Sequence, residues 1–171
     1  MSHLNIEIKA RCHDLEQAKA ILHASNARFA GLDHQVDTYF RISYGKLKLR
    51  EGNIENNLIY YDRETKEGPK QSNVFLYRSP PDKCLKELLT AALGTLILVD
   101  KSREIYWIEN VKFHLDNVLT LGTFLEIEAI DKTGDIGTHK LYEQCQQYMT
   151  TLNVQKEDLI SQSYSDMLLK K

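Results

Sequence analysis

The sequence predicts a single α+β domain over residues 1–171, in which about eight antiparallel strands close into a barrel and helices pack against its outside. Three observations lead to this fold class. Several segments alternate polar and apolar residues with period two, which is the pattern of a strand with one apolar face. Short turns connect most consecutive strands, as in antiparallel sheets. The other long segments place apolar residues at helical spacing, so they need an apolar surface to cover.

The strands are bounded by turn residues such as Gly, Asn and Pro, and their order along the chain can be read directly. They are expected at residues 4–11, 36–42, 46–51, 58–63, 74–79, 97–107, 112–117 and 124–130. Eight strands of this length are enough to close a barrel, which leaves no sheet edge exposed. The helices must then lie on the outer, apolar face.

Four helices are expected. The first covers residues 13–29, with Asp14 as its N-cap and apolar residues three and four positions apart. The second covers residues 82–94 and follows a proline pair that ends a strand. The last two begin at residue 135 and are separated near Asn153.

Composition limits the classes of function. Hydrophobic residues make up 42% and charged residues 27% of the chain, which is ordinary for a soluble domain. The net charge of −2 argues against a broad nucleic-acid footprint and against an anionic membrane as partner. No apolar run approaches the roughly 20 residues of a membrane span, and no signal-peptide pattern is present. The three cysteines have no metal-binding or redox spacing. We therefore expect a cytoplasmic protein with free thiols.

The polar faces of the expected strands carry mostly Lys, Arg, Glu and Asp. Glu7 and Lys9 share one strand face, as do Glu126 and Glu128, and residues at this spacing are about 6–7 Å apart. Each such charge taken alone is explained by solvent exposure. If the faces point into a closed barrel, however, they line a pore that suits a polyanion and a divalent metal held by carboxylates. The cations on these faces are Lys9, Lys48, Arg50, Arg63, Lys101 and Arg103.

An ordered series of short motifs over residues 4–130 resembles the CYTH superfamily, the triphosphate tunnel metalloenzymes. The segments are NIEIK at residues 5–9, QVDTYF at 35–40, KLR at 48–50, YDR at 61–63, GPK at 68–70, VDKSR at 99–103, HLDNV at 114–118 and LGTFLEIE at 121–128. Each piece is weak evidence alone, but the series in this order is highly specific. The residues of these motifs are most similar to those of the class IV adenylate cyclase branch.

The resemblance implies roles for individual residues. Glu7, Glu126 and Glu128 correspond to metal ligands for Mg²⁺ or Mn²⁺, and Asp116 and Lys101 to residues at the reacting centre. The phosphate contacts it implies are Lys9, Lys48, Arg50, Arg63, Lys70, Lys101 and Arg103. The chain departs from the family pattern at Asn5, which stands where the motif has its first glutamate. An amide oxygen can still ligate a hard cation, but it brings no charge.

Three functions fit these residues. In the first, an adenylate cyclase converts ATP to cyclic AMP and pyrophosphate. In the second, a triphosphatase hydrolyses thiamine triphosphate, a nucleoside triphosphate or tripolyphosphate. Both are in-line displacements assisted by cations and a metal. In the third, the chain binds a triphosphate or polyphosphate without turnover, and this reading is supported by Asn5 but opposed by the carboxylates, which repel an anion. The expected partner is a triphosphate small molecule such as ATP, and a homodimer is compatible with the sequence.

Overall fold

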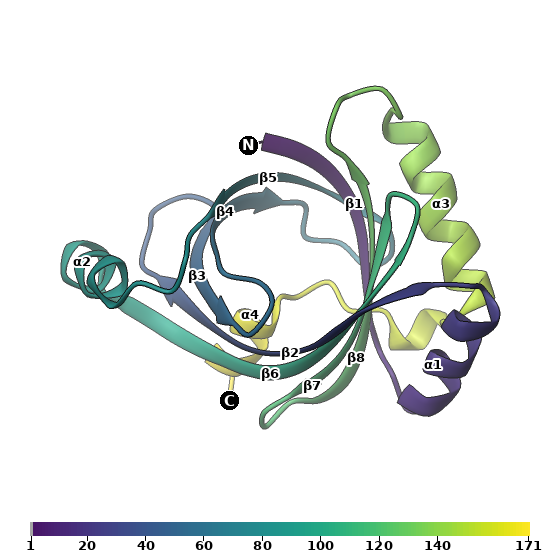
Figure 1. Ribbon diagram of the computed structural model, residues 1–171, viewed down its shortest axis with the longest axis horizontal. Helices are drawn as coiled ribbons and strands as arrows, with labels where there is room; N and C mark the ends of the chain where they lie inside the picture. Colours follow the sequence, from purple (N-terminus) through teal and green to yellow (C-terminus); the bar gives the residue numbers. More distant parts are fainter. Residues whose placement is uncertain (1) are drawn as a thin grey trace.

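The computed structural model describes residues 2–171, and eight strands form a closed antiparallel barrel (Figure 1). The strands are β1 (Ser2–Arg11), β2 (Arg28–Phe40), β3 (Lys46–Gly52), β4 (Asn57–Arg63), β5 (Lys70–Arg78), β6 (Thr95–Ile108), β7 (Val111–Val118) and β8 (Gly122–Asp131). Around the barrel they follow the order β1-β5-β4-β3-β2-β6-β7-β8, and β8 pairs with β1 to close it. The predicted fold class is confirmed.

The helices lie outside the barrel wall or at one of its ends. They are α1 (Leu15–Ala24), α2 (Lys83–Leu93), α3 (Thr138–Thr151) and α4 (Tyr164–Leu169), with a short 3₁₀ turn at Lys156–Asp158. Figure 1 shows α1 and α3 on the side of β1, β7 and β8, whereas α2 lies at the opposite end of the molecule. Asp14 and Asp82 cap α1 and α2 by accepting main-chain N–H bonds. No helix within residues 2–171 combines the length and apolarity needed to cross a bilayer.

The largest differences from the sequence prediction are at three boundaries: the end of the first helix, the start of β2, which was expected at residue 36, and the start of β5. The first helix ends at Ala24 instead of residue 29, because Asn26 adopts a positive φ of 56° and β2 already begins at Arg28 to pair with β6. Strand β5 begins at Lys70, four residues earlier than expected, because Lys70 lies opposite Glu7 in the register with β1. At these boundaries the local sequence favours a helix or a loop, but hydrogen bonding to the neighbouring strand places the residues in the sheet.

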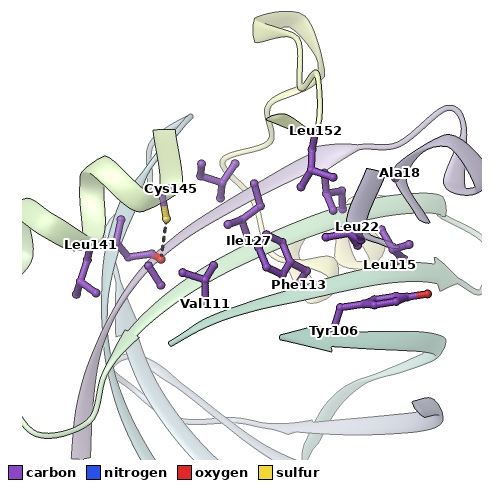
Figure 2. Packing of buried hydrophobic residues seen from close by; sticks show 14 residues of the cluster. Ala18, Leu22, Tyr106, Val111, Phe113, Leu115, Ile127, Leu141, Cys145 and Leu152 are labelled. Atoms are coloured by element: carbon purple, nitrogen blue, oxygen red, sulfur yellow. Dashed lines mark hydrogen bonds between the residues drawn. The ribbon is translucent and has the colours of Figure 1, made fainter. Parts of the chain in front are cut away.

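The main hydrophobic core lies between the barrel wall and the helices α1 and α3. Figure 2 shows Phe113 and Ile127 of the barrel between Leu22 of α1 on one side and Leu141 of α3 on the other, and all four belong to one buried cluster. The same figure shows the Cys145 thiol donating a hydrogen bond to the carbonyl oxygen of Ile6, 3.1 Å away. Since Ile6 and Ile8 face these helices, strand alternation turns the residues between them, and those on either side, toward the inside of the barrel.

A second apolar cluster lies inside the barrel beneath α4. It joins Tyr39, Tyr61, Val99 and Phe124 of the inner wall to Tyr164 of α4. Helix α4 begins in a capping box: Ser163 accepts the Asp166 N–H, and the Asp166 side chain accepts from Ser163. The C-terminal segment therefore inserts an aromatic ring into the barrel from one end.

Candidate functional site

The inner wall of the barrel carries charged side chains that are almost fully buried. Lys101 and Arg103 are each only 2% exposed, and Asp116 is 0% exposed. Buried charges are costly unless they are paired and hydrogen-bonded, so their partners define the organisation of the interior. The pairs form three groups.

The first group gathers around Asp37 on β2. Its carboxylate accepts two bonds from Arg50, at 2.8 and 2.9 Å, one from Lys48 at 3.0 Å and one from Lys101 at 2.9 Å. Burial alone would raise the pKa of Asp37, but Arg50, Lys101 and Lys48 outweigh it and hold the pKa well below its usual range. Burial lowers the pKa of Lys101 to about 7, against the pull of Asp37. This group contains three of the predicted phosphate-binding cations.

The second group centres on Asp116 of β7. Arg103 donates two bonds to this carboxylate, at 2.6 and 2.5 Å, and the Tyr164 hydroxyl donates a third at 2.7 Å. Burial would raise the pKa of Asp116, but Arg103 overcomes this and the pKa is lowered. Asp116 is therefore an ionised acceptor that fixes Arg103 on the inner wall. Its predicted place beside the reacting atoms stays a prediction.

The third group consists of Glu126 and Glu128 on β8 and His114 on β7. The Nδ1 atom of His114 lies 3.0 Å from Glu126 Oε2 and 3.8 Å from Glu128 Oε1, and one ligand atom from each residue lies within 4.8 Å of the others. Arg103 donates to Glu126 at 2.8 Å, and Lys9 pairs with the other oxygen of Glu126. Burial, then repulsion by cations such as Arg103, lowers the pKa of His114 well below 6.5, so the imidazole is neutral.

The remaining predicted residues lie around this third group. Arg63 of β4 donates to Glu7 of β1 at 2.5 Å, reaching across β5 on the inner face. Lys70 is also buried, but its ammonium donates to the carbonyl oxygens of Ile160 and Ser161, at 2.9 and 3.3 Å. Lys70 thus holds the C-terminal segment, whereas the other predicted cations contact carboxylates on the inner wall.

Asn5 lies on β1 two residues before Glu7, and therefore on the same face of the strand. It is 4% exposed, and its Oδ1 atom has no hydrogen-bond partner in the described part of the chain. Across the ladder it lies opposite Ser72 of β5 and Ile130 of β8. A buried carbonyl oxygen without a partner normally reduces the stability of the folded protein by about 1–3 kcal/mol. A ligand that contacts the Oδ1 atom of Asn5 would recover this energy.

A divalent metal fits this donor set. Glu126 and Glu128 offer carboxylate oxygens, and His114 offers a nitrogen within the same small volume. Glu7 faces Glu128 across the β1–β8 ladder. Burial raises the pKa of Glu128, and Glu7 adds repulsion to that effect, although Lys112 opposes it. Carboxylates crowded in this way favour a cation between them.

Sequence reasoning missed five side chains of the interior. His114 and Lys112 have the same parity on β7 as the predicted Asp116, so alternation could have found them. Asp37 lies on β2, where no site residue was predicted, and it is placed by its register with Arg50 of β3. Glu55 comes from the loop after β3; it accepts from Arg50 at 3.0 Å and pairs with Lys112. Tyr164 comes from α4, and its ring lies 3.5 Å from the Lys9 ammonium. No local pattern signals the last two, because only the closed fold brings them to the inner wall.

A cavity of about 290 Å³ lies beside α4, at the end of the barrel that Tyr164 enters. Its lining includes Tyr39, Phe40 and Leu96 together with Lys46 and Asp166. Lys46 donates to the Ser163 hydroxyl and to Asp166, each at 2.5 Å, so it ties β3 to the start of α4. The cavity combines aromatic and charged surface, and its lining residue Tyr39 has the Lys48 ammonium 5.4 Å from the centre of its ring.

Comparisons with known proteins agree with this architecture. The chain is 26% identical to a protein of Methanocaldococcus jannaschii named "Putative adenylate cyclase", over 96% of this chain and 98% of that protein. The structure of the PH1012 protein of Pyrococcus horikoshii is 24% identical and has a TM-score of 0.80, covering 95% of this chain and 98% of that one. The structure of a Hippeastrum protein, described as a putative adenylyl cyclase with a dominant triphosphatase activity, is 13% identical with a TM-score of 0.61, covering 98% and 94%.

The CYTH domain family matches residues 3–164, which is nearly the whole chain. The closed barrel and the buried charges on its inner wall are the features expected from the motif series. This chain belongs to the CYTH domain family.

Proposed function

We propose that this chain is a metal-dependent enzyme that binds a triphosphate inside the barrel and cleaves it, with ATP cyclisation as the first candidate reaction. The observation that carries the proposal is the arrangement of the buried charges: cations around Asp37 and Asp116 lie on the same inner wall as the carboxylates Glu7, Glu126 and Glu128. A site that only binds an anion has no need of carboxylates that repel it. A site that handles an anion together with a divalent cation needs both.

The cations are suited to phosphate oxygens. Arg50 and Arg103 each hold a carboxylate with two parallel N–H donors, and this planar fork matches two phosphate oxygens equally well. Lys48 and Lys101 supply point charges beside Arg50. A bound triphosphate would therefore exchange with Asp37 as the partner of these groups, while Asp116 keeps Arg103 in position.

Glu7, Glu126 and Glu128 would hold Mg²⁺ or Mn²⁺, which when bound neutralises phosphate charge and assists the in-line displacement. Lys101, with a pKa of about 7, can hold or release a proton near neutral pH. Its charged form supplies positive charge beside the phosphate oxygens, and the proton that the attacking hydroxyl loses passes to water. Arg103 and Lys9 supply positive charge where the equatorial phosphate oxygens gain negative charge.

Two reactions share this machinery. In cyclisation the ribose 3′-hydroxyl attacks the α-phosphorus and pyrophosphate leaves. The nucleoside must be held in a defined position for this attack, so it needs a binding site of its own. The 290 Å³ cavity with Tyr39, Phe40 and Leu96 provides apolar surface, and Tyr39 also lies near Lys48, which favours this reaction. In hydrolysis, water attacks the terminal phosphorus. The cations recognise phosphate oxygens that ATP and tripolyphosphate share, and the Hippeastrum protein of the same fold is described by a triphosphatase activity, so hydrolysis is the second candidate.

A product assay tests the proposal. The protein is incubated with ATP or tripolyphosphate, each with Mg²⁺, Mn²⁺ or a chelator, and cyclic AMP, pyrophosphate and phosphate are quantified. Metal-dependent cyclic AMP and pyrophosphate in equal amounts support cyclisation; metal-dependent phosphate supports hydrolysis. Lys48→Gln should reduce kcat/KM by about tenfold, the value of one charge-assisted hydrogen bond, whereas Lys140→Gln on the exposed face of α3 should not. Anion binding without any metal-dependent product would overturn the enzyme proposal.

A further inference from the structure

His114 is an unexpected side chain to find beside the two glutamates of β8. It is 1% exposed, it lies directly opposite Glu126 in the β7–β8 register, and its Nδ1 atom is within 4 Å of both Glu126 and Glu128. Its other nitrogen, Nε2, is buried without a hydrogen-bond partner among residues 2–171. An imidazole that served only to orient Glu126 would be expected to satisfy both nitrogens, because an unpaired buried polar atom is costly.

The surroundings keep this imidazole available as a ligand. Arg103 donates to Glu126 Oε2 at 2.8 Å, and the same oxygen lies 3.0 Å from His114 Nδ1, so this carboxylate is held beside the imidazole. A metal ligand must be the neutral imidazole with a free lone pair. The carboxylates Glu126 and Glu128 are its neighbours on the other side.

We propose that His114 binds the metal together with Glu126 and Glu128, and that this site selects Mn²⁺ or a comparable transition metal over Mg²⁺. Asn5 supplies an amide where the family motif has a carboxylate, so the donor set has one negative charge fewer and gains an imidazole nitrogen. Mg²⁺ strongly prefers oxygen ligands, whereas Mn²⁺, Co²⁺ and Zn²⁺ accept imidazole readily. The proposal rests on the proposed function, because it concerns the metal that the same site would use.

Direct ligation can be observed without substrate or turnover. The full chain, with its histidines labelled with ¹⁵N and its metals removed by a chelator, is titrated with Mn²⁺, and pulsed electron paramagnetic resonance measures coupling between bound Mn²⁺ and histidine nitrogen. We expect this coupling in the native chain. Mn²⁺ that binds without nitrogen coupling would overturn the assignment of His114 as a ligand.

Affinity measurements on variants give the second test. Isothermal titration with Mn²⁺ and Mg²⁺ is run on the native chain, on His114→Gln, and on His139→Gln as a control, since His139 is 91% exposed on α3. His114→Gln should weaken Mn²⁺ binding by about tenfold or more and weaken Mg²⁺ binding much less, while His139→Gln changes neither. Equal losses for both metals would contradict the metal preference.

The outcomes separate this inference from the proposed function. If both metals bind the native chain but no histidine nitrogen is coupled, only the role of His114 fails. If neither metal binds, the metal-dependent enzyme fails as well. Circular dichroism shows whether His114→Gln folds; nitrogen coupling that persists in His139→Gln but is lost in His114→Gln, or in His114→Asn if the first variant does not fold, assigns the ligand to His114.

Discussion

Lys101 gives the most quantitative prediction, because its charge changes near neutral pH. It is 2% exposed and contacts Asp37 at 2.9 Å, and it is also influenced by Arg50, Arg103 and Lys48. Burial and repulsion by these cations lower its pKa to about 7, although Asp37 favours the charged form. A bound triphosphate needs the charged ammonium, so binding above pH 7 must be accompanied by uptake of a proton.

The magnitude follows from that pKa. Below pH 7 Lys101 is already protonated in the free protein and adds no pH dependence. Above pH 7 each pH unit costs about 1.4 kcal/mol to protonate it, so its contribution weakens triphosphate affinity by about tenfold per unit until the pKa of the complex is reached. Lys101→Arg removes this slope, because a guanidinium stays charged throughout.

The assay is calorimetric titration of tripolyphosphate into metal-free protein between pH 6 and pH 9. The protonation of the ligand itself is common to both proteins and cancels in the comparison of the native chain with Lys101→Arg. Titration at pH 8 in two buffers of different ionisation enthalpy counts the protons taken up. We expect the native chain to take up more protons than Lys101→Arg, by up to one. Equal pH slopes and equal proton uptake would refute the reasoning, and would mean that Lys101 does not contact the anion.

Three other variants test separate parts of the structure. Asn5→Glu adds a carboxylate near Glu7 and should lower the Mn²⁺ concentration for half-maximal binding in calorimetry; an unchanged value would place Asn5 outside the metal shell. Tyr164→Phe removes a hydrogen bond to ionised Asp116 and should lower the free energy of unfolding in urea by about 1.5–3 kcal/mol; no loss would mean that the hydroxyl is replaced by another donor. Leu141→Ala, at a fully buried position, should cost about 2–5 kcal/mol in the same assay, with unchanged tripolyphosphate affinity because this core lies outside the barrel; a large loss of affinity would show that the two are coupled.

Strand alternation made most of the inner wall predictable from the sequence. Ile6 and Ile8 pack on the helices, so the parity of β1 fixes Glu7 and Lys9 as inward-facing residues. The same rule applies to His114, which has the parity of Asp116 on β7. It was not among the predicted site residues, because the sequence of β7 alone does not show which residues of β8 lie beside it. Only the register between β7 and β8 places His114 next to Glu126.

Tertiary contacts explain what could not be predicted. Glu55 belongs to a polar loop and Tyr164 to a six-residue helix near the chain end, and neither segment has a periodicity that points to the barrel interior. Lys70 was expected in a loop as a phosphate contact, but pairing with β1 extends β5 to include it. There its ammonium contacts main-chain carbonyls of the C-terminal segment.

The near-neutral charge of the chain is consistent with an anion site because the interior supplies its own counter-ions. Asp37 contacts three cations, and Glu126 accepts from Lys9 and Arg103 while facing His114. Metal ligation and ion pairing compete for the same oxygens of Glu126. A phosphate chain that replaces Glu126 as the partner of Lys9 and Arg103, with Arg103 still held by Asp116, frees Glu126 for a cation. Conversely, a cation at Glu126 leaves Lys9 and Arg103 free to bind phosphate. By linkage the two ligands should strengthen each other's binding, which is a physical reason for carboxylates to line the proposed anion site.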